Sequence, residues 1–248
     1  MNFIAIIPAR FSSSRLPGKP LLTIHGKPMI VRVIEQARKS NAKRVIVATD
    51  HPGIESVVKA INGEVCMTRS NHSSGIERIS EVLEHYQLPD DTVVVNIQGD
   101  EPMMPPEIIN QVASNIKLYD VNIATIAAPI TSIDEAFNPN IVKVVRDLYG
   151  HALYFSRAII PFHYKPLSIK SSTICDNVLR HIGIYSYHAR LIRQYIRWNK
   201  SPLECIESLE QLRILSYGEK IHVDLATVNP SNSIDTPEDL MRIRTAEI

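Results

Sequence analysis

The stretch FIAIIPARFSSSRLPGK, residues 3–19, joins a short apolar segment to a positively charged loop. The apolar segment does not alternate with polar residues, which is typical of a strand that is buried on both faces of a parallel sheet. Similar segments follow at 44–49, 92–97 and 123–129. Stretches with helical spacing of apolar residues lie between them, at 28–39, 53–61, 75–86 and 105–117. This alternation predicts an α/β fold with a doubly wound, mostly parallel sheet.

The pattern changes after residue 129. Residues 140–147 and 150–157 favour two strands of a hairpin, and residues 161–175, with two prolines, indicate a surface excursion. Two helices are expected next, then a strand and a final helix, at 187–198, 202–218, 221–227 and 235–248. We therefore expect one compact unit with two regions, an α/β core from 1–130 and 225–248 and a smaller mixed α/β lobe from 131–224.

The bulk composition excludes several classes of protein. The 248 residues carry a net charge of +1, so the chain as a whole is not expected to bind nucleic acid or a membrane surface. Cys66, Cys175 and Cys205 form no CxxC pair, which argues against a zinc site or a redox dithiol. The first apolar segment is too short for a signal peptide or a membrane span, so a cytoplasmic location is expected.

The loop after the first strand has an unusual charge. Arg10, Arg15 and Lys19 lie there, and no acidic residue precedes Glu35. Such a loop, at the carboxyl end of a strand, is where open α/β sheets bind ligands. It matches neither the Walker-type nor the dinucleotide-binding glycine pattern. Its cations and serines would suit a polyphosphate, although a solvated basic loop is the alternative.

Two aspartates are candidates for holding a metal ion. Asp100 follows the strand at 92–97, directly after Gly99, which permits a close approach of the backbone. A carboxylate facing a polyphosphate would require a divalent cation such as Mg²⁺ between them, whereas an ordinary turn aspartate is the alternative. Asp235 precedes Thr236 and Pro237, which resemble a helix start. Asp235 either lies outside that helix or caps it.

Several motifs together resemble one family over residues 3–240: IPARFSSSRLPGKPL at 7–21, NIQGDEP at 96–102, ALYFSRAIIP at 152–161, RHIGIY at 180–185 and DTPEDL at 235–240. The chain is similar to the 3-deoxy-manno-octulosonate (KDO) cytidylyltransferases. The resemblance implies a core of the nucleotide-diphospho-sugar transferase type, with a smaller lobe that binds the sugar and forms a homodimer. It also implies an enzyme of lipopolysaccharide synthesis that makes CMP-KDO and pyrophosphate from CTP and KDO.

The resemblance also assigns roles to residues. It implies catalytic roles for Lys19, Arg10, Arg15, Asp100 and Asp235, the last two as ligands of one or two Mg²⁺ ions. CTP would be bound by Ala9, Arg10, Arg15, Lys19, Ser74, Gly75 and Arg78. KDO would be bound by Gln98, Arg157, His181, Tyr185, Glu210 and Gln211.

Alternatives remain at several of these positions. His181 and Tyr185 could be a packed pair, and Glu210 a solvated helix residue. The segment 162–170, FHYKPLSIK, lacks an Arg and an Asp that are typical of the family near its start. Two other functions also remain: a cytidylyltransferase for another acid sugar, either an 8-amino analogue or a sialic acid, and a nucleotide-binding protein without turnover.

Overall fold

The computed structural model describes residues 2–12, 16–162, 164, 178–230 and 233–245. Within them a nine-stranded sheet has the order β11-β7-β10-β6-β1-β4-β5, with β8 paired to β10 and β9 paired to β8. Its strands are β1 (Ile4–Ala9), β4 (Arg44–Thr49), β5 (Glu64–Met67), β6 (Val93–Asn96), β7 (Ile123–Pro129), β8 (Lys143–Arg146), β9 (Ala152–Ser156), β10 (Leu179–His188) and β11 (Ile221–Leu225). A separate short hairpin joins β2 (Thr23–Ile24) and β3 (Lys27–Pro28).

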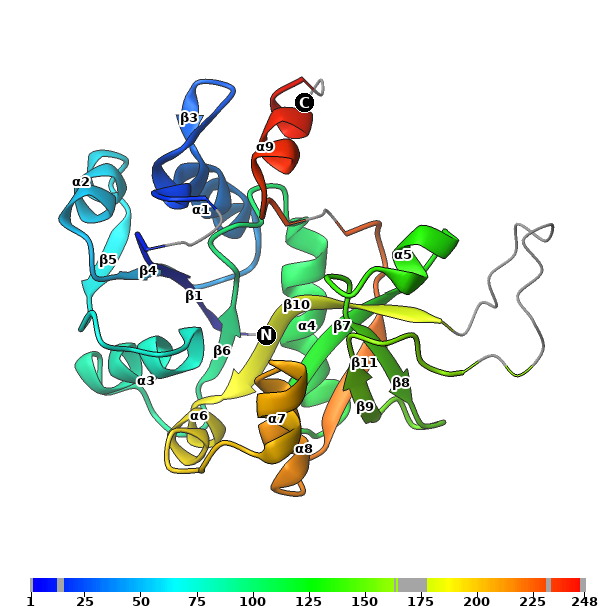
Figure 1. Ribbon diagram of the computed structural model, residues 1–248. Coiled ribbons are helices and arrows are strands. Elements are labelled where there is room, and N and C mark those ends of the chain that lie inside the picture. Colours follow the sequence, from blue (N-terminus) through cyan, green and yellow to red (C-terminus); the bar gives the residue numbers. More distant parts are fainter. Residues whose placement is uncertain (1, 13–15, 163, 165–177, 231–232, 246–248) are drawn as a thin grey trace.

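Helices cover both faces of this sheet (Figure 1). They are η1 (Lys19–Leu21), α1 (Met29–Lys39), α2 (Pro52–Ala60), α3 (Gly75–His85), α4 (Pro106–Leu118), α5 (Ile133–Phe137), α6 (Ala189–Tyr195), α7 (Pro202–Glu207), α8 (Gln211–Ser216) and α9 (Pro237–Thr245). Alternate residues of β1 enter different cores. Ile7 packs with α1, α2 and α4, while Ile6 packs with α3, α6 and α8. Two buried faces explain why the strands are continuously apolar.

The doubly wound α/β prediction is confirmed. Six of the seven strands along the main path run in one direction, because β10 is antiparallel to both of its neighbours, β6 and β7. The strands expected at 44–49 and 123–129 have the predicted bounds, and the hairpin of β8 and β9 is present. Part of the segment predicted as a surface excursion, residues 163 and 165–175, lies outside the described residues.

Several details differ from the sequence predictions, which did not include β5 or α5. No strand was expected at β10, whose polar residues and irregular pairing between Ile182 and Tyr185 hide the strand pattern. The helix expected at 187–198 begins only at Ala189, because β10 continues to His188. The single helix expected at 202–218 is two helices, since Ser208 adopts a left-handed conformation with φ of 53°.

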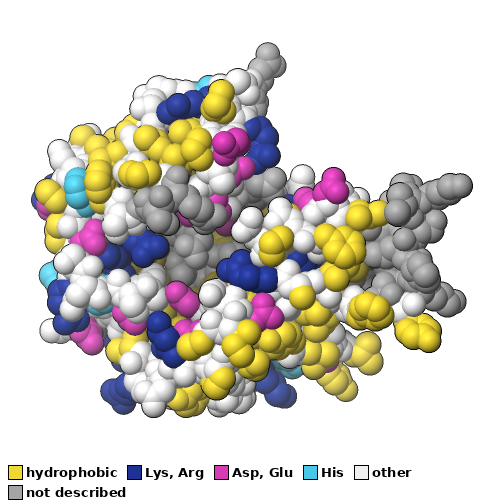
Figure 2. All heavy atoms as spheres, viewed as in Figure 1, with side chains coloured by type: hydrophobic (Ala, Val, Ile, Leu, Met, Phe, Trp, Pro, Cys, Tyr) yellow, Lys and Arg dark blue, Asp and Glu magenta, His cyan; other side chains and the backbone are white. Residues whose placement is uncertain are grey.

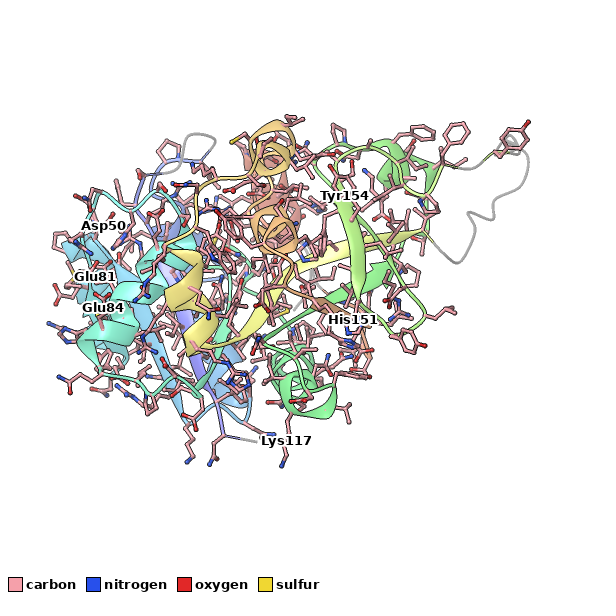
Figure 3. The ribbon with its side chains drawn as sticks, turned by 90° about the horizontal axis from the view of Figure 1, so that it is seen from below. Asp50, Glu81, Glu84, Lys117, His151 and Tyr154 are labelled. Carbon is pink, nitrogen blue, oxygen red and sulfur yellow. The ribbon has the colours of Figure 1, made fainter. Side chains whose placement is uncertain are left out.

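The two predicted regions share one sheet. β10 belongs to the predicted lobe, yet it lies between β6 and β7 of the predicted core. His151 and Tyr154 belong to the hairpin of β8 and β9. They lie on the opposite half of the molecule from Glu81 and Glu84 of α3 (Figure 3). The division at 130 and 225 therefore stays a prediction. Across the described part of the chain, every helix is too short or too polar to span a membrane.

A buried histidine makes the sheet edge sensitive to acid. His222 of β11 is 3% exposed, stacks on Tyr119 at 3.6 Å between ring centroids, and has no hydrogen-bond partner among the described residues for either ring nitrogen. Burial lowers the pKa of His222 from 6.5 to about 4, with further effects from Asp224, His151, Arg146 and Asp147. The unfolded chain therefore takes up this proton at a higher pH than the folded chain does.

We expect the stability that depends on His222 to be complete above pH 6.5 and to fall as the pH drops toward 4. Between pH 6.5 and 5 the loss should be about 2 kcal/mol, because each pH unit contributes at most about 1.4 kcal/mol. Denaturant unfolding of the wild type and of His222→Phe at pH 7.5 and pH 5 measures it. The variant should lose less stability on acidification, and an identical loss in both proteins would contradict the prediction.

Candidate active site

A cavity of about 500 Å³ opens at the carboxyl ends of β1 and β6 and extends over β10. Charged side chains of both signs border the hollow in the middle of the face seen in Figure 2. Most of the predicted site residues line the cavity: Ala9, Arg10, Lys19, Ser74, Gly75, Arg78, Gln98, Asp100, His181, Tyr185, Glu210, Gln211 and Asp235. The fold therefore brings segments from the whole length of the chain to one place.

The strongest polar contacts in the cavity connect Lys19 to two carboxylates. Its ammonium nitrogen lies 2.7 Å from Asp100 Oδ2 and 3.0 Å from Asp235 Oδ1. The Lys19 side chain is 9% exposed, while the two aspartates are about one third exposed. The shared ammonium offsets the repulsion between the two carboxylates, and Asp235 also accepts a hydrogen bond from Ser233 Oγ at 2.9 Å.

The local backbone explains how Lys19 reaches this position. Gly18 adopts the left-handed conformation, with φ of 66°, and precedes the short helix η1 that begins at Lys19. An L-residue at this position would be strained, so glycine fits here. The amide of Lys19 donates to the Leu16 carbonyl at 3.2 Å, which tightens the turn. The LPGKP motif therefore forms a compact turn that directs a lysine side chain inward.

The two aspartates are also held by their loops. A Cβ atom on Gly99 would lie 3.0 Å from the Pro8 carbonyl oxygen, so the loop before Asp100 passes close to β1. The amide of Ile234 donates to the Asp100 carbonyl at 3.0 Å and joins the two aspartate segments directly. These contacts confirm the predicted close approach at Gly99.

The start of α9 resolves the question about Asp235. Thr236 Oγ1 accepts from the Asp239 amide at 3.2 Å, and Asp239 Oδ2 accepts from the Thr236 amide at 3.0 Å. This reciprocal pair is a capping box, so Thr236 caps the helix. Asp235 lies just outside, with its carboxylate directed to Lys19.

The residues expected to bind the nucleotide have different surroundings. Arg10 follows β1 and is exposed at the cavity, whereas Arg15 lies outside the described residues. Ser74 caps α3 by accepting from the Glu77 amide at 3.3 Å. Arg78 is 3% exposed and forms an ion pair with Asp50 at 2.8 Å, so its charge is already balanced within the protein.

Most of the residues expected to bind the sugar lie along β10 and α8. Gln98 donates to the Gly183 carbonyl at 3.3 Å. The rings of His181 and Tyr185 lie 5.2 Å apart, so the packed pair that the spacing allowed is present, and both residues also line the cavity. Burial lowers the pKa of His181 to about 3, which keeps its imidazole neutral. Glu210 lines the cavity but is exposed, so a solvated residue at the start of α8 remains the alternative for it.

Arg157 does not line this cavity. Its guanidinium donates to three backbone carbonyls, those of Glu207 at 2.7 Å, Pro139 at 3.0 Å and Ser208 at 3.4 Å. It therefore braces the connection between α7 and α8. Its predicted contact with the sugar would require these hydrogen bonds to open.

Sequence reasoning did not single out several residues of the site. Burial, together with Asp100 and Asp235, raises the pKa of Glu101 to about 8. The feature of the sequence that could have identified Glu101 is its position directly after Asp100. Glu101 is not part of the cavity lining, whereas Asn96, Tyr187 and Tyr195 are. Asn96 precedes Gln98 by two residues and so shares its face of the strand, but nothing in the sequence connects Tyr195 to the cavity.

The donor set fits a hard divalent cation bound together with phosphate. The carboxylates of Asp100 and Asp235 already converge on one cationic group, the Lys19 ammonium. The described residues contain no cluster of three or more His, Cys, Asp or Glu side chains that could enclose a metal alone. Mg²⁺ commonly takes one or two carboxylates and completes its shell with phosphate oxygens and water.

Known proteins resemble the chain over nearly its full length. Residues 4–221 match the model of the cytidylyltransferase family. Two relatives, both called 3-deoxy-manno-octulosonate cytidylyltransferase, come from Erwinia tasmaniensis and Serratia proteamaculans. The first is 62% identical over 246 residues, 99% of each chain, and the second is 59% identical over 244 residues, 98% of each chain.

Solved structures agree with these relatives. The structure of a CMP:2-keto-3-deoxy-manno-octonic acid synthetase complexed with CTP has a TM-score of 0.88, with 39% identity over 98% of this chain and 97% of that one. A cytidylyltransferase from Leptospira borgpetersenii has a TM-score of 0.60 at 16% identity, covering 98% of this chain and 84% of that one, and shows the fold alone. The chain therefore belongs to the cytidylyltransferase family, among the 3-deoxy-manno-octulosonate cytidylyltransferases.

Proposed function

We propose that this enzyme transfers CMP from CTP to the anomeric hydroxyl of KDO and releases pyrophosphate. The main support is the meeting of Lys19, Asp100 and Asp235 in a cavity of a chain that is 62% identical to a 3-deoxy-manno-octulosonate cytidylyltransferase. The product would be the activated sugar used for lipopolysaccharide synthesis, made in the cytoplasm. Both the pathway and the location are part of the proposal.

The charged end of the cavity is suited to CTP. We assign the triphosphate to Arg10, Arg15 and Lys19, and the nucleoside to the backbone at Ala9 and the start of α3 at Ser74 and Gly75. The solved structure with a TM-score of 0.88 is a complex with CTP, which supports the choice of nucleotide. Arg78 would act through its ion pair with Asp50 by fixing α3, because its charge is already balanced.

The reaction requires charge on the phosphates to be neutralised. The sugar hydroxyl attacks the α-phosphorus and loses its proton to solvent, a P–O bond forms, and the bond to pyrophosphate breaks. Lys19 is placed to stabilise negative charge that moves to the leaving group. Asp100 and Asp235 would hold Mg²⁺, one or two ions, which supplies Lewis-acid polarisation of the phosphate when bound. Binding CTP would draw Lys19 from the carboxylates toward the phosphates.

The sugar acid would lie over β10 and α8. Gln98, His181, Tyr185, Glu210 and Gln211 are our candidates for its hydroxyls. Arg157 stays a candidate for its carboxylate, provided that it leaves the three carbonyls it now contacts.

A substrate panel tests the proposed reaction. Pyrophosphate release is measured with CTP and Mg²⁺, first without sugar and then with KDO, its 8-amino analogue or a sialic acid. We expect release with KDO only. If pyrophosphate were released only with a different sugar, the assignment of the nucleotide site would stand and the assignment of KDO as the substrate would be wrong. Binding of CTP without release for any sugar would make the protein a nucleotide binder.

Charge-removing variants test the roles of the carboxylates. Asp100→Asn and Asp235→Asn should each lower kcat by about 100-fold or more, because a ligand of the neutralising cation is lost. Without divalent cations they should bind CTP at least as tightly as the wild type, since a negative charge facing the phosphates is removed. Isothermal titration with and without Mg²⁺ separates these effects.

The exposed Asp91→Asn is the matched control, because Asp91 lies away from the cavity lining. It should change neither kcat nor the gain in CTP affinity on adding Mg²⁺. If Mg²⁺ increased the CTP affinity of Asp100→Asn and Asp235→Asn as much as that of the wild type, these carboxylates would not be the metal ligands.

We also propose a homodimer that forms through the predicted lobe. Hydrophobic side chains gather on the half that carries α5, β8 and β9 (Figure 2). Phe137, Leu153 and Phe162, all in the predicted lobe, are 61%, 62% and 81% exposed. A second copy of the chain, with the same surface, is the partner of matching chemistry.

Leu153→Asp should therefore shift the protein from dimer to monomer, because a charge would be buried in the interface. Light scattering after gel filtration measures the mass. Met241→Asp, at an equally exposed position on α9, should leave the mass unchanged. A monomeric wild type would refute the homodimer.

A further inference from the structure

Three polar atoms in the cavity are buried without a hydrogen-bond partner among the described residues. They are Asn96 Oδ1, the Tyr185 hydroxyl and the Tyr195 hydroxyl. Buried polar groups in folded proteins almost always have partners, so unpartnered ones that line a cavity point to a ligand. Tyr185 was expected to contact the sugar, whereas Asn96 and Tyr195 have no role in the function described above.

These residues come from neighbouring elements. Asn96 ends β6 and lies directly opposite Tyr185 in the antiparallel pairing with β10. Burial raises the pKa of Tyr187 well above its ordinary value, while a hydrogen bond with the Asn96 side chain acts in the opposite direction. This contact orients the Asn96 amide and leaves its Oδ1 as a free acceptor.

The ring of Tyr195 is fixed from outside the cavity. The Arg213 guanidinium lies 4.3 Å from the centre of the Tyr195 ring, and Trp198 meets the ring edge-on at 6.2 Å. Arg213 is in turn held by two hydrogen bonds to Glu204, at 2.7 and 2.5 Å. The Tyr195 ring is therefore held in place, so a ligand that meets its hydroxyl does not have to order it.

The position of this group indicates which part of a substrate it meets. Asn96 precedes Gln98 by two residues on the same face of the chain, so it lies about 7 Å farther from the phosphate end. Both Tyr185 and Tyr195 interact electrostatically with Glu210, a candidate for sugar binding. The cationic residues that line the cavity, Arg10 and Lys19, lie at its other end, while Arg78 is paired with Asp50.

The Arg213 guanidinium beside Tyr195 is already paired with Glu204, so the hydroxyl and amide groups suit an uncharged polyol and not a phosphate or carboxylate. We propose that Asn96, Tyr185 and Tyr195 form a subsite for the terminal diol of the substrate's exocyclic side chain, with Tyr195 as a specificity-determining residue. This inference rests on the proposed function, because it assigns one end of KDO within the same cavity.

Tyr195→Phe tests the subsite, because it removes one hydroxyl and keeps the ring between Arg213 and Trp198. Pyrophosphate release is measured with KDO and with its 8-deoxy analogue, which lacks the terminal hydroxyl. The variant should lose about tenfold in kcat/KM with KDO, through KM, and almost nothing with the analogue. The KM for CTP should not change.

Tyr217→Phe is the matched control. Tyr217 stacks on the same Trp198, at 4.5 Å between ring centroids, but does not line the cavity. It should leave the preference for KDO over the 8-deoxy analogue as in the wild type. Thermal unfolding provides a second measurement, in which KDO alone should stabilise the wild type more than Tyr195→Phe.

The outcomes separate the two levels of the assignment. Equal losses for both sugars in Tyr195→Phe would overturn the subsite while leaving the cytidylyltransferase function intact. A raised KM for CTP would also overturn it and would place Tyr195 at the base. No pyrophosphate release by the wild type with KDO would instead refute the proposed function itself.

Discussion

The site depends on the contact of one lysine with two carboxylates. Asp100 and Asp235 would repel each other in a cavity unless a cation lay between them, and the Lys19 ammonium takes that position. The three residues come from the loop after β1, the loop after β6 and the segment before α9. Parallel pairing of β1 with β6 places the first two side by side, and the hydrogen bond from Ile234 to Asp100 attaches the third. The proposed binding of Mg²⁺ would exchange one cation for another at these carboxylates and would leave the Lys19 ammonium for the phosphates.

The cavity has two ends with different chemistry. One end has cations and the two carboxylates paired with Lys19, a charged setting that suits transfer of a phosphoryl group. The other end has hydroxyl, amide and neutral imidazole groups, where burial keeps His181 uncharged. β10 provides most of this second end and stands antiparallel in an otherwise parallel path. A sugar acid and a nucleotide can therefore lie in one cavity and still meet different surroundings.

Much of this arrangement was predictable from local patterns. The strands of the core, the capping box at Thr236 and the close approach at Gly99 each depend on a few neighbouring residues. The strand β10 was not expected, because its polar residues face the cavity and an irregularity interrupts its pairing. The break at Ser208 was also missed, since a left-handed serine has no distinctive sequence signal. The contacts of the Arg157 guanidinium with backbone carbonyls were not predictable either, and its role toward the sugar stays a prediction.

The sequence by itself determined the fold class, the positive charge of the loop after β1 and the choice of Asp100 and Asp235 as candidate metal ligands. Apolar periodicity and short motifs act over a few residues and can therefore be read locally. Only the tertiary structure decided that Lys19 joins both aspartates, which lie 81 and 216 residues away. It also decided that Tyr195 of α6 and Asn96 of β6 line the same cavity. Such contacts depend on the order of strands in the sheet, and that order is set by the packing of both faces at once and not by any local segment.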